Sequence, residues 1–237
     1  MFPIHDDTPT RITPYVTYGV IVACVLIFIW QLSLGDWGQH AVYSFGVIPA
    51  VLLSGKSLPV DLDVLPAWLT IFSSMFLHGG WMHLIGNMLY LWVFSNNVED
   101  AMGHKRFIVF YLLCGFLAAM TQAVLDPASE IPMIGASGAI SGVLGAYLLL
   151  LPHARILVII PLGILIYTPW IPAFWVLGFW FVLQVFNSWL SASEMGGIAY
   201  GAHLGGFVAG MLLIPFFKYR NVPLLAPALT EQKIVRK

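Results

Sequence analysis

Long apolar segments recur along the chain and are separated by short polar stretches. A bilayer core about 30 Å thick requires roughly 20 apolar residues for each helix that crosses it. Six segments have or approach this length: Pro14–Leu34, Gly80–Val98, Arg106–Leu125, Ser137–Leu151, Ile171–Leu190 and Gly197–Phe217. We therefore predict an all-α membrane protein with six membrane-spanning helices. They form one domain over residues 14–217, between an N-terminal tail at 1–13 and a basic C-terminal tail at 218–237.

The apolar segment Ile156–Trp170 is harder to assign, because Pro161, Gly163 and Pro169 interrupt it. An interfacial segment, a re-entrant piece and a seventh helix all fit its length. With six spans and a cytoplasmic N-terminus, nine of the ten Lys and Arg residues lie in the cytoplasm and only Lys56 lies outside. This distribution agrees with the positive-inside rule. A seventh span would move the five C-terminal cations to the outer side, so we predict six spans with both termini inside.

The composition supports a membrane protein and excludes several other classes. Of the 237 residues, 59% are hydrophobic and 9% are charged, and the mean hydropathy is +0.88. Soluble domains are typically about 45–50% apolar and about 25% charged. The formal net charge of −1 and the two cysteines, both in apolar segments, argue against a nucleic-acid binder and a disulfide scaffold.

The predicted outer loops hold acidic residues and one long semi-apolar segment. Six acidic residues fall in these loops: Asp36, Asp61, Asp63, Asp126, Glu130 and Glu194. No Asp or Glu lies within a predicted span. The first outer loop, Gly35–Leu77, contains Trp37 and Trp68 among other apolar residues, and we expect it to lie on or dip into the membrane interface.

Three polar clusters interrupt the apolar segments, where polar groups are costly and are functional candidates. The first contains His78, His83 and Asn87, and the last two share a helix face because they are four residues apart. The second contains Ser137, where an outer loop enters the fourth span, and the third contains His203 in the sixth span. All three clusters lie in the outer halves of alternate spans.

The second and third clusters are expected to lie at a similar depth in the membrane. At 1.5 Å per residue, His203 lies roughly 9 Å below the start of its span, and the short fourth span begins below the surface at Ser137. A hydroxyl and an imidazole in one layer can act as nucleophile and general base. Asn87 and His83 could then stabilise an oxyanion. Because no carboxylate lies in a span, we expect a dyad rather than a Ser-His-Asp triad.

Small residues support contact between the fourth and sixth spans. Gly138, Gly142 and Gly145 line one face of the fourth span, and His203, Gly206 and Gly210 follow a helical spacing in the sixth. Small residues allow two helices to approach closely in lipid.

Less specific interpretations also exist for each motif. The G-x-S-G sequence at Ser137 is compatible with packing alone, and a single intramembrane histidine can be structural. His78 and His83 are five residues apart, which does not suit two metal ligands on one helix face, so we expect no metal. Gln184 in the fifth span is interpreted as an interhelical contact.

Taken together, the three motifs resemble those of the rhomboid intramembrane serine proteases. Ser74–Met88 (SMFLHGGWMHLIGNM) resembles the second-helix signature, Gly135–Gly142 (GASGAISG) the nucleophile motif, and Ala202–Gly206 (AHLGG) the sixth-helix motif. The resemblance covers all six spans, and it implies a six-helix rhomboid-like bundle with a long first external loop.

The resemblance also implies a role for each motif residue. Ser137 is the nucleophile and His203 the general base, while Asn87, His83 and the backbone N–H of Ser137 form the oxyanion hole. His78 is structural, Gly135 shapes the adjoining loop, Gly138 and Gly206 support the helix contact, and the fifth span is a lateral gate. Where many relatives place an aromatic residue against the catalytic histidine, this chain has Ser141, and the first loop lacks the Trp-Arg pair of some relatives.

The expected function is cleavage of other membrane proteins within or just outside a transmembrane helix, near the outer membrane face, through an acyl-enzyme. Substrates should carry small or helix-breaking residues near the cut, because a helix hides its carbonyl groups. The alternative is a non-catalytic rhomboid-like protein that binds transmembrane clients. A small transporter is a weaker alternative, because neither inverted repeats nor charged midplane residues are found. We expect no cofactor and no nucleic-acid partner. The absence of a visible transit peptide favours a prokaryotic plasma membrane.

Overall fold

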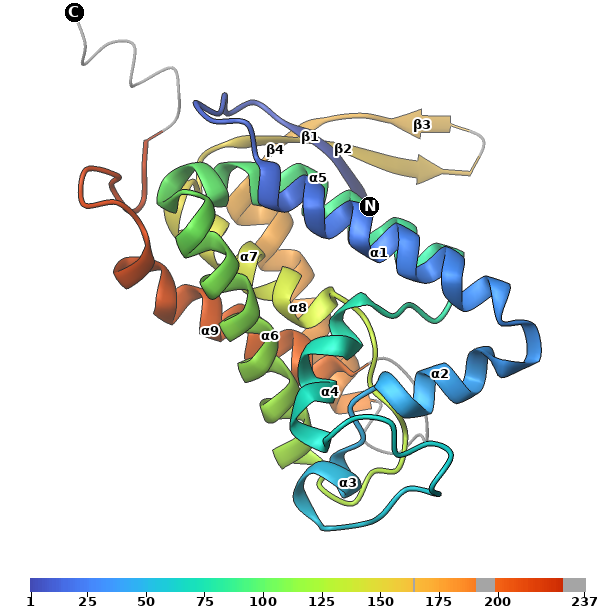
Figure 1. The fold of residues 1–237 in the computed structure, drawn as a ribbon. Helices are drawn as coiled ribbons and strands as arrows, with labels where there is room; N and C mark the ends of the chain where they lie inside the picture. The colour runs from blue at the N-terminus through green and yellow to red at the C-terminus, as the bar shows by residue number, and fades with distance from the viewer. Residues whose placement is uncertain (164, 191–198, 228–237) are drawn as a thin grey trace, which may run out of the picture.

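Helices account for most of the chain, and a small β-sheet lies at one end of them (Figure 1). The structure is a computed structural model that describes residues 1–163, 165–190 and 199–227. The α-helices of this described part are α1 (Tyr15–Ser33), α2 (Gly38–Phe45), α3 (Pro49–Leu53), α4 (Ala67–Ser73), α5 (Trp81–Met102), α6 (His104–Leu125), α7 (Ser137–Leu150), α8 (Ala173–Leu190) and α9 (Tyr200–Phe217). The shorter elements are the 3-10 helices η1 (Gly35–Trp37) and η2 (Ser74–Phe76) and the strands β1 (Phe2–Asp6), β2 (Arg155–Leu162), β3 (Leu165–Tyr167) and β4 (Trp170–Pro172).

Each predicted span corresponds to one helix, in the order α1, α5, α6, α7, α8 and α9. In the described part of the chain, four of these, α1, α6, α8 and α9, are long and apolar enough to cross a bilayer. Helix α7 is apolar but has only 14 residues. The number of helices that cross the membrane therefore stays a prediction. Parts of that prediction lie outside the described residues, namely the start of the sixth span at Gly197, the acidic Glu194 and the cations Lys233, Arg236 and Lys237.

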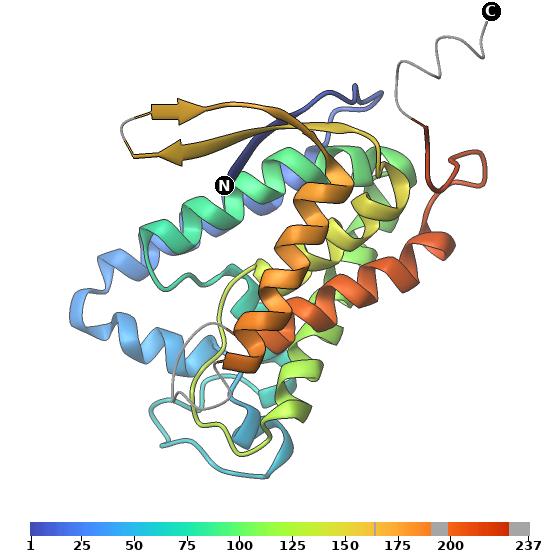
Figure 2. The same ribbon diagram turned by 180° about the vertical axis from the view of Figure 1, so that it is seen from behind.

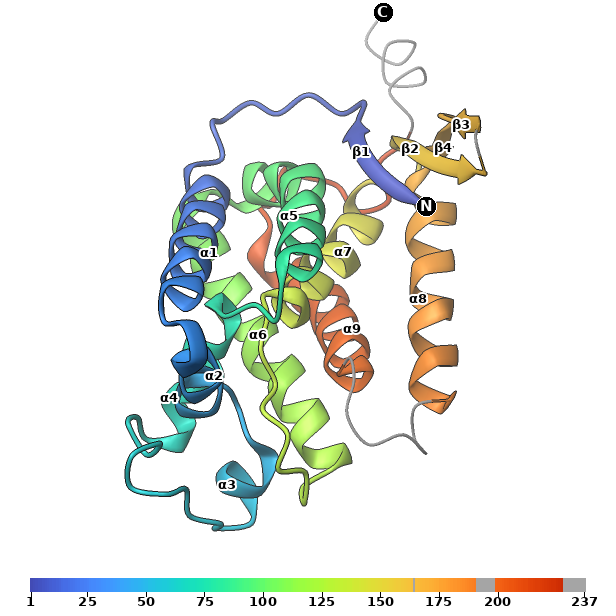
Figure 3. The same cartoon turned by 90° about the vertical axis from the view of Figure 1, so that its right-hand side faces the viewer.

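The predicted all-α architecture is wrong for Ile156–Trp170, which forms strands rather than a seventh helix. Strand β2 is rich in β-branched residues, which favour a pleated surface. Its side chains alternate in burial, since Ile156 and Val158 are fully buried and Leu157 is half-buried. Strand β1 lies beside α5, and the sheet lies beyond the start of α8 (Figure 3). An interfacial location for this segment stays a prediction.

Strand β2 is the central strand of this sheet and also recruits the N-terminus. It pairs antiparallel with β1 along one edge and with β3 and β4 along the other. Residues of the predicted N-terminal tail thus form a strand. The Asp6 carboxylate anchors that strand, because it accepts hydrogen bonds from Asn97 Nδ2 at 2.7 Å and from the Tyr147 hydroxyl at 2.8 Å. Burial raises the pKa of Asp6, although the bond from Tyr147 opposes this shift.

Helix α7 lies in the centre of the bundle and contacts α5, α6, α8 and α9. Every residue from Ala139 to Tyr147 is buried. In contrast, the peripheral helices expose large apolar side chains, for example Leu26 at 60%, Trp175 at 65% and Phe216 at 81%. An apolar exterior around a packed centre is what a lipid environment requires.

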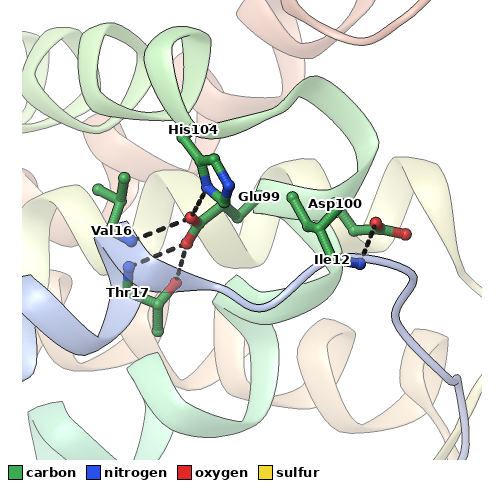
Figure 4. A network of polar contacts seen from close by, with 6 residues as sticks. All are labelled: Ile12, Val16, Thr17, Glu99, Asp100 and His104. Atoms are coloured by element: carbon green, nitrogen blue, oxygen red, sulfur yellow. Dashed lines mark hydrogen bonds and ion pairs between the residues drawn. The ribbon is translucent and has the colours of Figure 1, made fainter.

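A buried carboxylate joins α1 to α5 at the end of the bundle near the sheet (Figure 4). Helix α5 continues past the predicted end at Val98, so Glu99 and Asp100 lie in its last turn. Glu99 is fully buried and accepts hydrogen bonds from the backbone N–H groups of Val16 and Thr17 and from the Thr17 hydroxyl, at 2.6–3.0 Å. His104 Nδ1 lies 2.6 Å from the same carboxylate. Glu99 therefore supplies acceptors to the first turn of α1, whose N–H groups have no partner within the helix.

We expect Glu99→Gln to destabilise the protein by about 2 kcal/mol, because the amide nitrogen would face donors and leave a buried group unpaired. The free energy of unfolding can be measured by titrating detergent-solubilised protein with SDS. Asp100→Asn is the matched control, since Asp100 accepts its bonds from Arg11 and Ile12 at 3.2–3.3 Å and is only half-buried. Equal stability of Glu99→Gln and the parent protein would show that the carboxylate has no such role.

The first predicted outer loop contains α2, α3 and α4 and lies at the end opposite the sheet (Figure 1). It is tied to the segment before α7 by an isolated β-bridge between Val47 and Met133, and Lys56 forms an ion pair with Glu130. Trp37 and Trp68 are exposed at 66% and 60%. Association of this loop with the membrane stays a prediction.

Candidate active site

Ser137 and His203 come from two different helices and form a direct hydrogen bond. Ser137 is the first residue of α7, and His203 lies in the first turn of α9. The Ser137 Oγ and His203 Nε2 atoms are 2.8 Å apart. The structure thus brings together the hydroxyl and the imidazole that the sequence places 66 residues apart.

Glycines allow these two helices to approach closely, so the predicted contact between them is confirmed. A Cβ atom at Gly206 would overlap the carbonyl oxygen of Gly138 and would lie 3.3 Å from the Cβ of Ala118 on α6. A Cβ atom at Gly138 would lie 2.8 Å from the same Ala118 atom. Gly138 and Gly206 therefore set the spacing of the helices that carry Ser137 and His203.

The second ring nitrogen of His203 forms a hydrogen bond with a side chain of α8. Its Nδ1 atom lies 2.8 Å from Gln184 Oε1. Because an amide oxygen only accepts, Nδ1 carries the proton and Nε2 is left to accept from Ser137 Oγ. The interhelical contact predicted for Gln184 is thus confirmed, but its link to His203 could not be predicted without knowing how α8 is rotated.

Aromatic rings flank the imidazole in place of the residue that many relatives have at position 141. The ring centroids of Trp180 and Tyr200 lie 6.1 and 6.2 Å from that of His203. Ser141 instead donates a hydrogen bond from its hydroxyl to the Ser137 carbonyl at 2.7 Å. The ring is therefore packed by residues of α8 and α9.

Asn87 and His83 lie one turn apart on α5, as predicted. The Nδ2 group of Asn87 donates one hydrogen bond to the His83 carbonyl at 2.8 Å and keeps a second N–H. The Gly79 backbone N–H donates to His83 Nδ1 at 3.3 Å. This bond leaves the ring proton on Nε2, so His83 presents a donor there.

Gly135 lies between His83 and Ser137. Its φ of +121° is a conformation that side chains rarely adopt. A Cβ atom at this position would lie 2.8 Å from His83 Nε2 and 3.7 Å from Ser137 Oγ. The glycine therefore keeps open a space that a donor and a hydroxyl both border.

His78 belongs to the loop that precedes α5 and is 2% exposed. Its backbone N–H donates to Gln31 Oε1 at 3.0 Å, and its Nδ1 lies 3.1 Å from the Phe76 carbonyl. Burial lowers the pKa of His78 to about 4, and nearby His83 adds to the shift, so the ring is neutral at physiological pH. Within the described residues, no group of three or more His, Cys, Asp or Glu side chains is arranged to bind a metal ion.

A cavity of about 40 Å³ adjoins Ser137. Its walls are small or apolar, and they include Ala118, Ala202, Gly138 and Met133. The site therefore combines a hydroxyl, an imidazole, amide and ring donors, and a small cavity.

Comparison with known proteins identifies the family. The sequence pattern of the family described as "Rhomboid domain" matches residues 66–220, which include all the site residues above. The mitochondrial Rhomboid protein 1 of Saccharomyces cerevisiae is 31% identical over 164 residues, which are 66% of this chain and 44% of the yeast protein. In Bacillus subtilis, the rhomboid protease GluP is 31% identical over 136 residues, which are 57% of this chain and 24% of GluP. The putative rhomboid protease YdcA of the same organism is 28% identical over 142 residues, which are 60% of this chain and 65% of YdcA. The chain thus spans less than two thirds of the length of each of these three relatives, and it belongs to the rhomboid family of membrane proteins.

Proposed function

We propose that this chain is an intramembrane serine endopeptidase that cleaves transmembrane segments of other membrane proteins. The observation that carries the proposal is the 2.8 Å contact between Ser137 Oγ and His203 Nε2. A neutral imidazole with its proton on Nδ1 can accept the hydroxyl proton as Ser137 attacks a carbonyl carbon.

The proposed acylation proceeds in two proton transfers. The Ser137 Oγ–H proton moves to His203 Nε2 while Oγ forms a bond to the scissile carbonyl carbon. The imidazolium then gives this proton to the departing amide nitrogen, and the C–N bond breaks. The acyl-enzyme is hydrolysed by water, which His203 activates in the same way. Serine and histidine thus suffice for a dyad mechanism.

The oxyanion of the tetrahedral intermediate would be stabilised by three donors. These are the free N–H of Asn87 Nδ2, the Nε2–H of His83 and the backbone N–H of Ser137. The last of these groups lies in the first turn of α7, where backbone N–H groups have no partner within the helix. Removal of one such donor typically costs about 10²–10³ in kcat.

The preferred substrate would carry a small residue near the cut. The cavity of about 40 Å³ beside Ser137 is bordered by small residues such as Gly138, Ala118 and Ala202, which favours a small side chain. Small and helix-breaking residues also allow the local unwinding that exposes a carbonyl group. The partners proposed are single-span or other membrane proteins and the bilayer, without a cofactor or nucleic acid.

We further propose six spans with both termini in the cytoplasm. Two cations, Arg106 and Arg155, lie at the sheet end of the bundle. The Arg106 side chain donates to the Phe217 carbonyl, and the Arg155 backbone N–H in β2 donates to the Asp7 carboxylate. Lys56 and Glu130 lie at the other end. This asymmetry supports a cytoplasmic sheet end. A prokaryotic plasma membrane is the proposed location.

The proposal can be tested by incubating the purified chain in liposomes with a fluorophosphonate probe and, separately, with a single-span reporter. We expect the probe to label Ser137 selectively, as mapped by mass spectrometry, and the reporter to be cut. Pretreatment with the probe should stop the cleavage. Binding of the reporter without cleavage or labelling would instead favour the non-catalytic, client-binding alternative.

A further inference from the structure

The hydrogen bond between Gln184 and His203 connects the imidazole to α8, a helix with few buried residues. The buried residues of α8 are Ala173, Val176 and Leu177, all near its first turn. The rest of the described helix is half-buried or exposed. Figure 3 shows α8 at the edge of the bundle, and Figure 2 shows it beside α9. Gln184 thus contacts His203 from the less buried part of α8.

Two aromatic contacts accompany the bond from Gln184. The ring centroids of Trp180 and Phe207 are 5.9 Å apart, and those of Phe181 and Phe207 are 4.7 Å apart. Together with the Trp180 contact to His203, these place one face of α8 against α9. An outward displacement of this part of α8 would separate Gln184 and Trp180 from the imidazole at once.

The direction of the bond determines which nitrogen can act as a base. With Nδ1–H donating to Gln184 Oε1, the lone pair of Nε2 faces Ser137. Without this acceptor, the neutral ring can place its proton on Nε2, which would then donate to the hydroxyl and could not accept its proton. In the described part of the chain, the ring bonds are to Ser137 and Gln184 and none is to a carboxylate.

We propose that Gln184 is a positioning residue, which holds His203 in the tautomer that can act as a base only while α8 lies against α9. The inference deepens the proposed proteolytic function and rests on it. An amide suits this position, because its oxygen continues to accept from Nδ1–H after the ring is protonated and adds no charge to an apolar helix. The position of α8 thereby controls the competence of the base.

The kinetic test compares three variants of the full chain in liposomes with a single-span reporter. Gln184→Leu should lower kcat by about 10–100-fold with KM unchanged, because part of the general-base contribution is lost. Gln184→Glu keeps an acceptor oxygen and should retain most of the activity. Asn187→Leu is the matched control, since it makes the same kind of change on α8 and the Asn187 side chain has no hydrogen-bond partner among the described residues. Parent-like kcat for Gln184→Leu would overturn the proposal.

A spectroscopic test separates this inference from the proposed function. The ¹⁵N chemical shifts of the His203 imidazole should show a protonated Nδ1 in the parent protein and a mixture of tautomers in Gln184→Leu. The same tautomer in both proteins would overturn the inference whether or not the chain cleaves the reporter. If the parent is inactive, or Ser137→Ala remains active, the proposed function fails, and the ¹⁵N shifts still decide the role of Gln184.

Discussion

Replacing Ser137 by alanine is expected to lower the rate of reporter cleavage by about 10⁴–10⁶-fold, since the change removes the only atom that can form the acyl-enzyme. The hydroxyl makes one described side-chain contact, to His203 Nε2, and the alanine methyl group occupies less space. The fold should therefore persist, and fluorophosphonate labelling should disappear. The measurement is the initial rate of reporter cleavage in liposomes, with circular dichroism to verify the helix content.

Ser141→Ala is the matched control for this change, because it removes a hydroxyl one helical turn further along α7. That hydroxyl donates to the Ser137 carbonyl, so its loss should change the rate by no more than a few-fold. If Ser137→Ala cleaved the reporter at a rate close to that of the parent chain, the nucleophile would have to be another group. Equal losses in the two variants would indicate a packing defect rather than the loss of a nucleophile.

The pairing of Ser137 with His203 could be predicted because several local signals agree. Both residues lie in apolar segments, where polar groups are rare, and both are followed by glycines at helical spacing. Glycine faces determine which helices approach closely, and the structure has Gly138 against Gly206. Glycine spacing and the cost of burying polar groups therefore favour this pairing, while the roles of the two residues follow from the resemblance to the family.

The β-sheet could not be predicted in the same way, because its strands depend on contacts between distant residues. Phe2 pairs with Ile159, and the intervening chain includes the helices α1 to α7. Locally, Ile156–Trp170 is only an apolar segment with prolines, which suits several structures. Glu99 presents a similar difficulty, since its side chain can be fully buried only because α1 supplies hydrogen-bond donors.

Gln184 illustrates an intermediate case. A single amide in an apolar helix indicates an interhelical hydrogen bond, and this much is visible in the sequence. Which helix provides the partner depends on the rotation of α8 about its own axis. The hydrophobic pattern does not define this rotation, because α8 is apolar on nearly every side.

A second large effect is expected at Gly210, where α9 crosses α7. We expect Gly210→Ala to lower the free energy of unfolding by at least about 3 kcal/mol, above the usual range for overpacking. A Cβ atom here would overlap the carbonyl oxygen of Gly142 and would lie 2.7 Å from its Cα. Backbone atoms cannot rotate away as a flexible side chain can, so one helix must move. The measurement is an SDS titration of detergent-solubilised protein, followed by tryptophan fluorescence.

Gly86→Ala provides the control, because a Cβ atom at Gly86 on α5 meets nothing within 4 Å. That variant should unfold within about 1 kcal/mol of the parent and tend toward greater stability, since alanine favours a helix over glycine. Gly210→Ala should also lose cleavage activity, because a displaced α9 carries His203 away from Ser137. If both variants unfolded at the same SDS concentration as the parent protein, the fold would not require the close approach of α7 and α9. Another feature would then have to hold Ser137 and His203 in place.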